Sequence, residues 1–330
     1  MSNSPTMHVV EVDPALQEDL NSDDYASSGY ENSLSSSIEQ YAYENGRRYH
    51  TYFGDDKNLQ PTDETEQDRL DLHHEIFLIL LGGRLHLAPI GKTPQRILDV
   101  GTGTGIWAIE MADKYPNAMV FGLDLSPIQP KWVPPNCRFE VDDAERDWTH
   151  ELDYFDFIHI RNLAQAISDW PKLLSQAYEC TAPGGYIELA ELETAPHSDD
   201  GTLDSATDLL RYFSLLHEGL ARMGNLTAVA AETLKSNLEN AGFVDVTVTT
   251  RKHPLAPWPK DPKMKHAGAL ALLSCQTGFH AYGIAIFTRV LGIDPVEADR
   301  ICRAAIAQNG SRSHHIYTYY HVLHARKPLA

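Results

Sequence analysis

The chain of 330 residues has few cysteines, and they form no recognisable metal or disulfide pattern. The four of them are widely spaced and include no Cys-x-x-Cys pair, which argues against a zinc site and against a disulfide framework. The histidine pairs at 73–74 and 314–315 lack companion ligands at metal spacing, so we expect no bound metal. The cysteines are Cys137, Cys180, Cys275 and Cys302.

Basic residues are also scarce, with 27 Lys and Arg against 46 Asp and Glu and a formal net charge of −19. Such a surface repels phosphate backbones, so we expect no direct contact with nucleic acid. The first 20 residues contain neither Lys nor Arg, which argues against a signal or transit peptide. No apolar run approaches the roughly 18 residues of a membrane span. These absences predict a cytoplasmic protein without membrane contact; the alternative location is nuclear.

The acidity is concentrated near the start of the chain. Residues 1–66 hold 14 Asp and Glu against 3 Lys and Arg. Residues 1–38 are also rich in Ser and Asn, and Tyr25 and Tyr30 are their only aromatic residues. A segment of this composition cannot bury enough apolar surface to fold, so we predict a disordered acidic arm over residues 1–38.

The rest of the chain predicts one α/β core with two helical additions. Apolar residues at helical spacing near 38–42 and over 63–81 predict an N-terminal helical lid spanning 39–90. Residues 91–250 together with 314–330 form the predicted core. Residues 251–313 begin with four prolines and continue with helical stretches, which predicts a helical cap inserted before the last strand.

Within this core, short apolar runs alternate with helical segments. The alternation predicts parallel βαβ units and hence a Rossmann-like, doubly wound sheet of seven strands. The expected strands are 96–100, 119–123, 138–141, 155–160, 186–190, 243–250 and 315–325. The expected helices are 106–115, 170–179, 205–223 and 228–241 in the core, and 263–291 and 295–308 in the cap.

A glycine-rich turn, Asp99-Val100-Gly101-Thr102-Gly103-Thr104-Gly105, follows the first of these strands. A strand that ends in such a turn and opens a helix presents backbone N–H groups to a cofactor. Dinucleotide binders favour Gly-x-Gly-x-x-Gly, but position 106 is Ile, and no Tyr-x-x-x-Lys pair of the short-chain dehydrogenases occurs. The spacing instead resembles motif I of class I methyltransferases, which implies S-adenosyl-L-methionine as cofactor.

Carboxylates follow the next two strands. Asp124 lies 23 residues past Gly101 and is placed to accept hydrogen bonds from both ribose hydroxyls. NAD-binding proteins use a carboxylate in the same way, so this residue does not distinguish the two cofactors. In methyltransferases, an acidic residue followed by a small one typically contacts the adenine, which favours Asp143 over Asp142 for this role. The predicted cofactor-binding residues are Asp99, Gly101, Thr102, Gly103, Gly105, Asp124, Leu125, Asp142, Asp143, Ala144, Arg161 and Asn162.

Two side chains are candidates for a catalytic role. His159, late in the fourth strand, could act as a base; the alternative is a buried histidine hydrogen-bonded within the sheet. Glu191, just past the fifth strand, could position a substrate amine or hydroxyl; the alternative is a solvated loop. Candidates for lid or substrate contacts are Tyr41, Arg47, Tyr49 and Tyr52, with packing on the sheet as the alternative.

Taken together, these motifs make the chain similar to the LaeA-like family of fungal methyltransferases over roughly residues 40–328. The matching stretches are 43–50, 66–71, 85–90, 101–108, 124–130, 142–145, 155–162, 169–171, 183–188, 198–203 and 257–262. The family includes a nuclear regulator of secondary-metabolite genes and also enzymes that act on small molecules.

The resemblance therefore implies a class I methyltransferase fold and a role in fungal secondary metabolism. We expect a tailoring enzyme with an apolar small-molecule acceptor under the cap; the alternative is a nuclear regulator acting through protein partners. The composition of the cap suits a homodimer interface equally well. The residues do not indicate whether oxygen, nitrogen or carbon is methylated.

Overall fold

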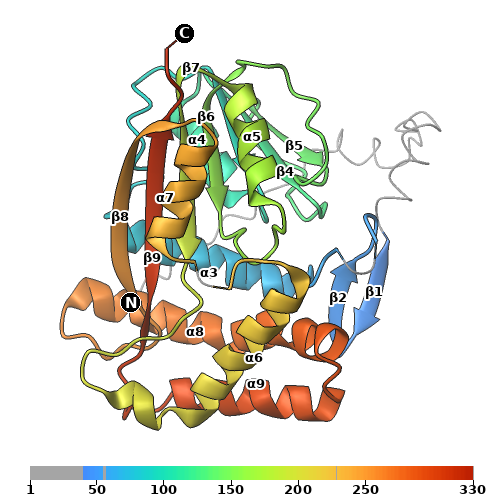
Figure 1. Cartoon of the computed structure of the whole chain (residues 1–330), viewed down its shortest axis with the longest axis vertical. Coiled ribbons are helices and arrows are strands. Elements are labelled where there is room, and N and C mark those ends of the chain that lie inside the picture. The colour runs from blue at the N-terminus through green and yellow to red at the C-terminus, as the bar shows by residue number, and fades with distance from the viewer. Residues whose placement is uncertain (1–39, 55–56, 228, 330) are drawn as a thin grey trace, which may run out of the picture. The chain divides into compact units, whose positions relative to one another are not determined.

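A seven-stranded mixed sheet organises the protein (Figure 1). The computed structural model describes residues 40–54, 57–227 and 229–329, so the predicted acidic arm lies outside the described residues. From Tyr41 onward the chain forms one compact unit. The strands are β3 (Arg96–Val100), β4 (Met119–Asp124), β5 (Cys137–Val141), β6 (Phe155–Arg161), β7 (Thr181–Leu192), β8 (Val244–Pro254) and β9 (Tyr317–Arg326).

The strands lie in the order β5-β4-β3-β6-β7-β9-β8. The first five pair in parallel, and β9 is antiparallel to both of its neighbours. The order reverses between β3 and β6, and in open α/β sheets the crevice beyond the carboxyl ends of the strands at such a point is where ligands bind. The predicted α/β fold with seven strands is confirmed.

Helices cover both faces of the sheet because successive strand side chains point to opposite sides. Ile97 and Phe157 pack against α4 (Ile106–Lys114), and α3 (Glu64–Leu80) lies on the same side. Leu98 and Ile158 face α5 (Trp170–Cys180) and α7 (Ala231–Asn240) on the other side. The carboxyl ends of the parallel strands remain open between these layers.

The segment before α3 differs from the prediction of a helical lid. Residues 41–50 form a hairpin of β1 (Tyr41–Glu44) and β2 (Arg47–His50). Its two turn residues, Asn45 and Gly46, have positive φ angles of 51° and 75°, the conformation of a type I′ turn, which favours Asn-Gly. The helical spacing near residue 41 was therefore misleading. The helix expected over 63–81 is present as α3.

A second apolar core lies in the cap. It contains α6 (Thr207–Met223), α8 (Pro262–Ala285), the π-helical turn η3 (Ile286–Val290) and α9 (Pro295–Asn309), which follows the short helix η2 (Thr202–Ser205) by way of α6. These helices lie together below the sheet in the view of Figure 1. We predicted that α6 belongs to the central domain, but its apolar stripe packs against α9 and η3.

The helical stretch Pro262–Val290 is long and apolar enough to cross a membrane, judged by length and composition alone. This corrects the expectation that no apolar run approaches that length. In the structure, 56% of its most apolar window is buried, and α8 packs against α3, α9 and β8. A core helix of a soluble protein satisfies the same criterion, so the finding is weak evidence for a membrane span.

Candidate active site

Two adjoining cavities lie at the carboxyl ends of the strands. One, of about 180 Å³, is lined by Gly101, Gly103 and Asp124; we call it the glycine-loop cavity. The other, of about 100 Å³, lies between the sheet and the cap and is lined by Glu191 and His253, among others; we call it the cap cavity. The two share three lining residues, Asn162, Gln165 and Tyr282. A group bound in one cavity is therefore next to a group bound in the other.

The glycine loop forms one wall of the first cavity. The backbone N–H groups of Gly101 and Thr102 donate to the Leu123 carbonyl at 2.8 and 3.0 Å, which ties the loop to β4. Gly101 has a φ of +71°, and a Cβ there would come within 2.5 Å of the Leu163 side chain. Only glycine satisfies both conditions. Gly105 lies outside both cavities and caps the start of α4.

Two of the predicted cofactor residues brace this loop from beneath and do not line the cavity. The Thr102 hydroxyl donates to Asp99 Oδ2 at 2.6 Å, and Asp99 Oδ1 lies 2.7 Å from His159 Nδ1. The His159 ring is buried and stacks on Trp107 at 3.8 Å. Because His159 lines neither cavity, the structure places it as the buried histidine hydrogen-bonded within the sheet.

Asp124 ends β4 with its carboxylate at the glycine-loop cavity, and Leu125 follows it in the same wall. Its Oδ2 accepts a hydrogen bond from Gly103 N–H at 2.8 Å, and its Oδ1 accepts one from Ser126 N–H at 2.9 Å. Limited access of solvent to the carboxyl raises the pKa of Asp124 to about 6, against these two hydrogen bonds, which favour the ionised form. Because Asp124 lines the cavity, its carboxylate can also accept hydrogen bonds from a diol bound there.

Asp142, Asp143 and Ala144 all line the same cavity beyond β5. Asp143 is already engaged, since Oδ1 accepts from Glu145 N–H at 3.0 Å and Oδ2 lies 3.1 Å from the Lys57 ammonium. Asp142 Oδ1 accepts from Asp143 N–H at 2.8 Å, and its Oδ2 makes no hydrogen bond within the described ranges. Asp142, the second choice from sequence, thus has the less committed carboxylate of the two.

Arg161 and Asn162 lie at the end of β6. The Arg161 guanidinium lies 3.2 Å from His74 Nδ1 and 5.4 Å from the centre of the Phe77 ring. Asn162 has a φ of +57°, and its N–H donates to the Ala190 carbonyl at 3.1 Å. This backbone conformation directs the chain away from the sheet at the wall that the two cavities share.

Residues 57–62 line the glycine-loop cavity and were missed by sequence reasoning. The Lys57 ammonium lies 3.1 Å from both Asp143 and Glu145, and the Asn58 amide donates to the Ser126 hydroxyl at 3.0 Å. The only sequence signal was that Lys57 is the single lysine in the acidic stretch 1–66. We call residues 57–62 the strap.

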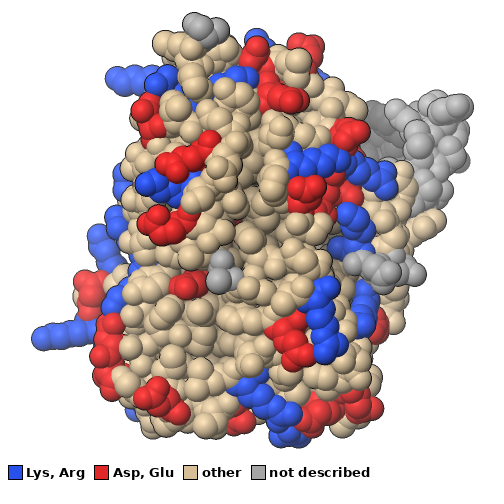
Figure 2. Space-filling model, viewed as in Figure 1, with Lys and Arg blue, Asp and Glu red and all other residues tan. Residues whose placement is uncertain are grey.

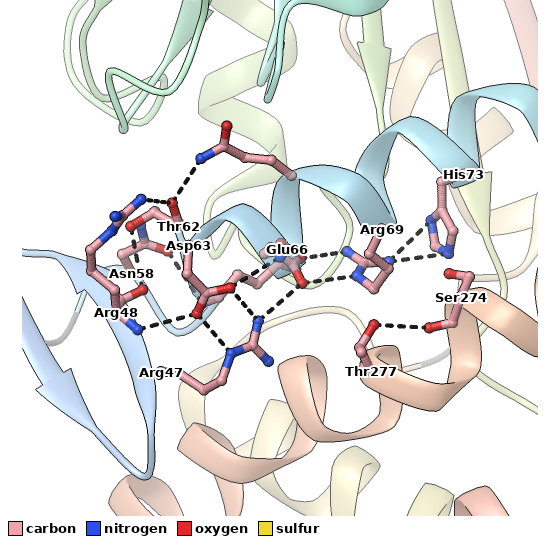
Figure 3. Close-up of polar contacts among 12 residues, drawn as sticks. Arg47, Arg48, Asn58, Thr62, Asp63, Glu66, Arg69, His73, Ser274 and Thr277 are labelled. Atoms are coloured by element: carbon pink, nitrogen blue, oxygen red, sulfur yellow. Dashed lines mark hydrogen bonds and ion pairs between the residues drawn. The ribbon is translucent and has the colours of Figure 1, made fainter.

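The predicted lid residues of the hairpin lie outside both cavities. Arg47 instead joins the hairpin to α3 by two hydrogen bonds of 2.8 Å to Asp63 (Figure 3). Tyr49 is buried beneath the Arg289 guanidinium, with 4.6 Å to the ring centre, and Tyr41 lies under Arg48 at 5.1 Å. Tyr52 is 42% exposed. These contacts show a structural role for Arg47 and Tyr49.

Charged side chains continue from the hairpin along α3 to the cap cavity (Figure 3). Arg47 lies 3.8 Å from Glu66, which accepts two hydrogen bonds from Arg69. Arg69 in turn contacts the ring of His73 at 3.1 Å. Arg69 and Glu66 are both buried, so their ion pair compensates two charges that water does not solvate.

Glu191 lies within β7 and is 1% exposed, which corrects both its predicted place after the strand and the alternative of a solvated loop. Its Oε1 accepts from Leu163 N–H at 3.0 Å and its Oε2 from Ala164 N–H at 3.1 Å. Burial raises the pKa of Glu191 to about 8. The carboxyl borders the cap cavity, whose apolar wall is formed by Tyr212, Phe213, Leu216, Leu255 and Phe279.

The strand order, the glycine loop and the carboxylates at successive strand ends define a class I S-adenosylmethionine-dependent methyltransferase. Residues 72–248 match the family described as "Methyltransferase domain", and the chain belongs to this family. It is 41% identical to the methyltransferase pytC of Aspergillus terreus over 299 residues, covering 90% of this chain and 91% of that protein.

It is also 39% identical to the secondary metabolism regulator LAE1 of Cochliobolus heterostrophus, over 86% of this chain and 94% of that protein. A solved structure of phosphoethanolamine N-methyltransferase 2 from Haemonchus contortus, in complex with S-adenosyl-L-methionine, is 17% identical with a TM-score of 0.47. It covers 93% of this chain and 75% of that chain. The relatives place this protein among methyltransferases related to fungal secondary metabolism.

The cofactor is S-adenosyl-L-methionine, and the residues of the glycine-loop cavity fit it. Gly101 and Gly103 line the cavity without side chains, Asp124 offers a carboxylate for a diol, and Asp142 offers one for an amine. When bound, the cofactor supplies a methyl group on a positively charged sulfur. The protein's part is to orient the two reactants and to exclude water.

Proposed function

We propose that this methyltransferase modifies a small, largely apolar molecule held in the cap cavity, as a tailoring enzyme of fungal secondary metabolism. The observation that carries the proposal is the wall of Asn162, Gln165 and Tyr282 that the cap cavity shares with the glycine-loop cavity. An acceptor in the cap cavity would lie next to the cofactor, as in-line methyl transfer requires.

The size and lining of the cap cavity support an acceptor of this class. Its volume of about 100 Å³ is of the same order as cavities that bind a single aromatic ring. Aromatic side chains of α6 and α8, among them Tyr212 and Phe279, form part of its apolar wall. Folded macromolecules do not enter such a space, whereas a ring-sized part of a small metabolite does.

Glu191 is assigned a positioning role in this proposal. Both of its oxygens accept N–H groups from the turn that carries Leu163 and Ala164, immediately before Gln165 in the shared wall. Loss of this carboxyl would release the turn between the two cavities. We further propose a cytoplasmic location, where a soluble metabolite and the cofactor are both available.

A regulatory function through protein partners is the second candidate, and the 39% identity to LAE1 favours it. The visible face of the molecule offers no large patch of one charge, since Lys and Arg are interspersed with Asp and Glu (Figure 2). The cap cavity supports the enzymatic proposal more directly because a regulator that acts only by docking has no need of it.

The test is methyl transfer from S-adenosyl-L-methionine with a tritiated methyl group. The purified protein is incubated with the small-molecule fraction of a fungal culture and, separately, with its protein fraction. We expect label in small organic-soluble products. Asp124→Ala should strongly reduce the transfer at cofactor concentrations below the dissociation constant, whereas Asp147→Ala, at a side chain that is 95% exposed, should leave it unchanged. Label in the protein fraction alone would overturn the small-molecule proposal.

A further inference from the structure

Two matched Thr–His pairs bridge strands β8 and β9. His253 of β8 is paired with Thr318 of β9, and Thr250 of β8 is paired with His321 of β9. His253 Nδ1 lies 3.2 Å from the Thr318 hydroxyl, and His321 Nδ1 lies 2.9 Å from the Thr250 hydroxyl. Both rings are at most 5% exposed. Only the first pair borders the cap cavity.

The second ring nitrogen of His253 has no hydrogen-bond partner among the residues that the structure describes. Nε2 is buried and, within the described part of the chain, no atom makes a hydrogen bond to it. A buried polar atom without a partner costs about 1–3 kcal/mol, so it requires an explanation, and at a cavity wall a bound ligand supplies one. With Nδ1 facing Thr318, Nε2 is the unpaired ring nitrogen of a residue that lines the cavity.

The ionisable Arg and Glu side chains around the cavity already have protein partners. Arg69 is paired with Glu66, Glu193 lies 2.9 Å from His197, and Glu191 accepts two backbone N–H groups. A carboxylate or phosphate in this space would find no uncommitted cation among the described lining residues. A neutral molecule with one hydrogen-bonding group fits the remaining surface better.

We propose that the methyl acceptor is a neutral ring compound bearing a hydroxyl group, and that His253 Nε2 binds this hydroxyl, so that the product is an O-methyl ether. This inference rests on the proposed function of the cap cavity. Tyr212, Phe213 and Phe279 enclose the ring, and Thr318 fixes the orientation of the imidazole.

The residues account for the proton in this reaction. The methyl group leaves the sulfonium sulfur, which keeps the electron pair of the broken C–S bond and becomes a neutral thioether. The acceptor oxygen forms the new C–O bond and loses its proton to His253 Nε2, while Nδ1–H donates to the Thr318 hydroxyl. Burial lowers the pKa of His253 to about 4, so the ring is neutral beforehand, takes up the proton only as the new C–O bond makes the hydroxyl strongly acidic, and afterwards releases it readily.

The experiment measures binding rather than turnover. Ligand-observed NMR, with the protein saturated by S-adenosylhomocysteine, compares p-cresol, toluene and p-toluate, which share one ring and differ in the polar group. We expect p-cresol to bind about tenfold more tightly than toluene, as one hydrogen bond to an otherwise unpaired buried group predicts, and p-toluate to bind most weakly.

Single variants distinguish loss of the His253 ring nitrogen from loss of the folded structure. His253→Leu keeps the volume and should reduce the preference for p-cresol over toluene to about twofold or less, while His253→Gln should restore part of it. His321→Leu removes the matched histidine outside the cavity and should keep the full preference. Thr318→Val should weaken the preference for p-cresol over toluene although the imidazole of His253 is still present. Affinity for S-adenosylhomocysteine reports that each variant is folded.

Equal binding of p-cresol and toluene to the wild type would overturn the inference. An unchanged preference for p-cresol in His253→Leu would also overturn it, as would an unchanged preference in both single variants Thr318→Val and His253→Gln. Those results leave the proposed function standing, provided that S-adenosylhomocysteine binds and label reaches a small molecule. Failure of these last two measurements overturns the proposed function itself.

Discussion

The carboxylate of Asp124 should make cofactor binding depend on pH. Its pKa is raised to about 6 because solvent has little access to it, and Asp99 nearby adds to the rise. The two ribose hydroxyls of the cofactor can both donate only to the ionised carboxylate. Since binding draws on the ionised fraction, affinity should fall as the pH drops through 6.

The magnitude follows from that pKa. About nine tenths of the carboxyl groups are ionised at pH 7 and about one tenth at pH 5, so the dissociation constant should rise about tenfold between the two. Asp124→Asn should weaken binding by about 1–3 kcal/mol at pH 7 and show little further change at pH 5.

Calorimetry with S-adenosylhomocysteine at pH 5, 6 and 7 provides the measurement. Asp142→Asn is the matched control, because it alters a carboxylate in the same cavity but leaves Asp124 in place; it should retain the tenfold dependence. A wild-type dissociation constant that is equal at pH 5 and pH 7 would refute the assignment of Asp124 to the ribose.

Three further perturbations test other parts of the site. Glu191→Gln should remove a pH dependence of stability. The native carboxyl, with its pKa raised to about 8, holds a proton that the unfolded chain releases above its ordinary pKa. The free energy of unfolding of the wild type, measured by urea titration, should therefore fall by a few kcal/mol (roughly 1.4 per pH unit) between about pH 5 and pH 8, and that of the variant should not. Gly101→Ala should abolish cofactor binding in calorimetry, because its Cβ would lie 2.5 Å from Leu163, whereas Gly82→Ala, with a similar φ and open space, should only lower the melting temperature slightly. Lys57→Ala should speed release of S-adenosylhomocysteine by up to about fivefold in stopped-flow measurements, a modest effect because the Lys57 side chain is 43% exposed. An unchanged release rate would show that the strap does not retain the cofactor.

The parts of the structure that sequence predicted are those encoded locally. The strands are short apolar runs, and the glycine loop with Asp124 and Asp143 follows strand ends that the topology must bring to one edge. The hairpin was not predicted although its signal, Asn45-Gly46, is also local, because the apolar residues around it recur at helical spacing. Arg47 was expected to lie over the cofactor, but its guanidinium is hydrogen-bonded to Asp63 at the start of α3.

The acceptor site was harder to predict because no local stretch encodes it. His253 lies near the end of β8, Glu191 lies in β7, Arg69 comes from α3 and Tyr212 from α6. Their convergence depends on how the cap packs on the sheet. The cofactor site needs only the strand ends, whereas the cap cavity needs α6 and α8 as well. Substitutions in those two helices can therefore change the acceptor without altering Asp124 or the glycine loop. Relatives that share this cofactor site should accordingly differ in acceptor wherever residues 212, 253 and 279 differ.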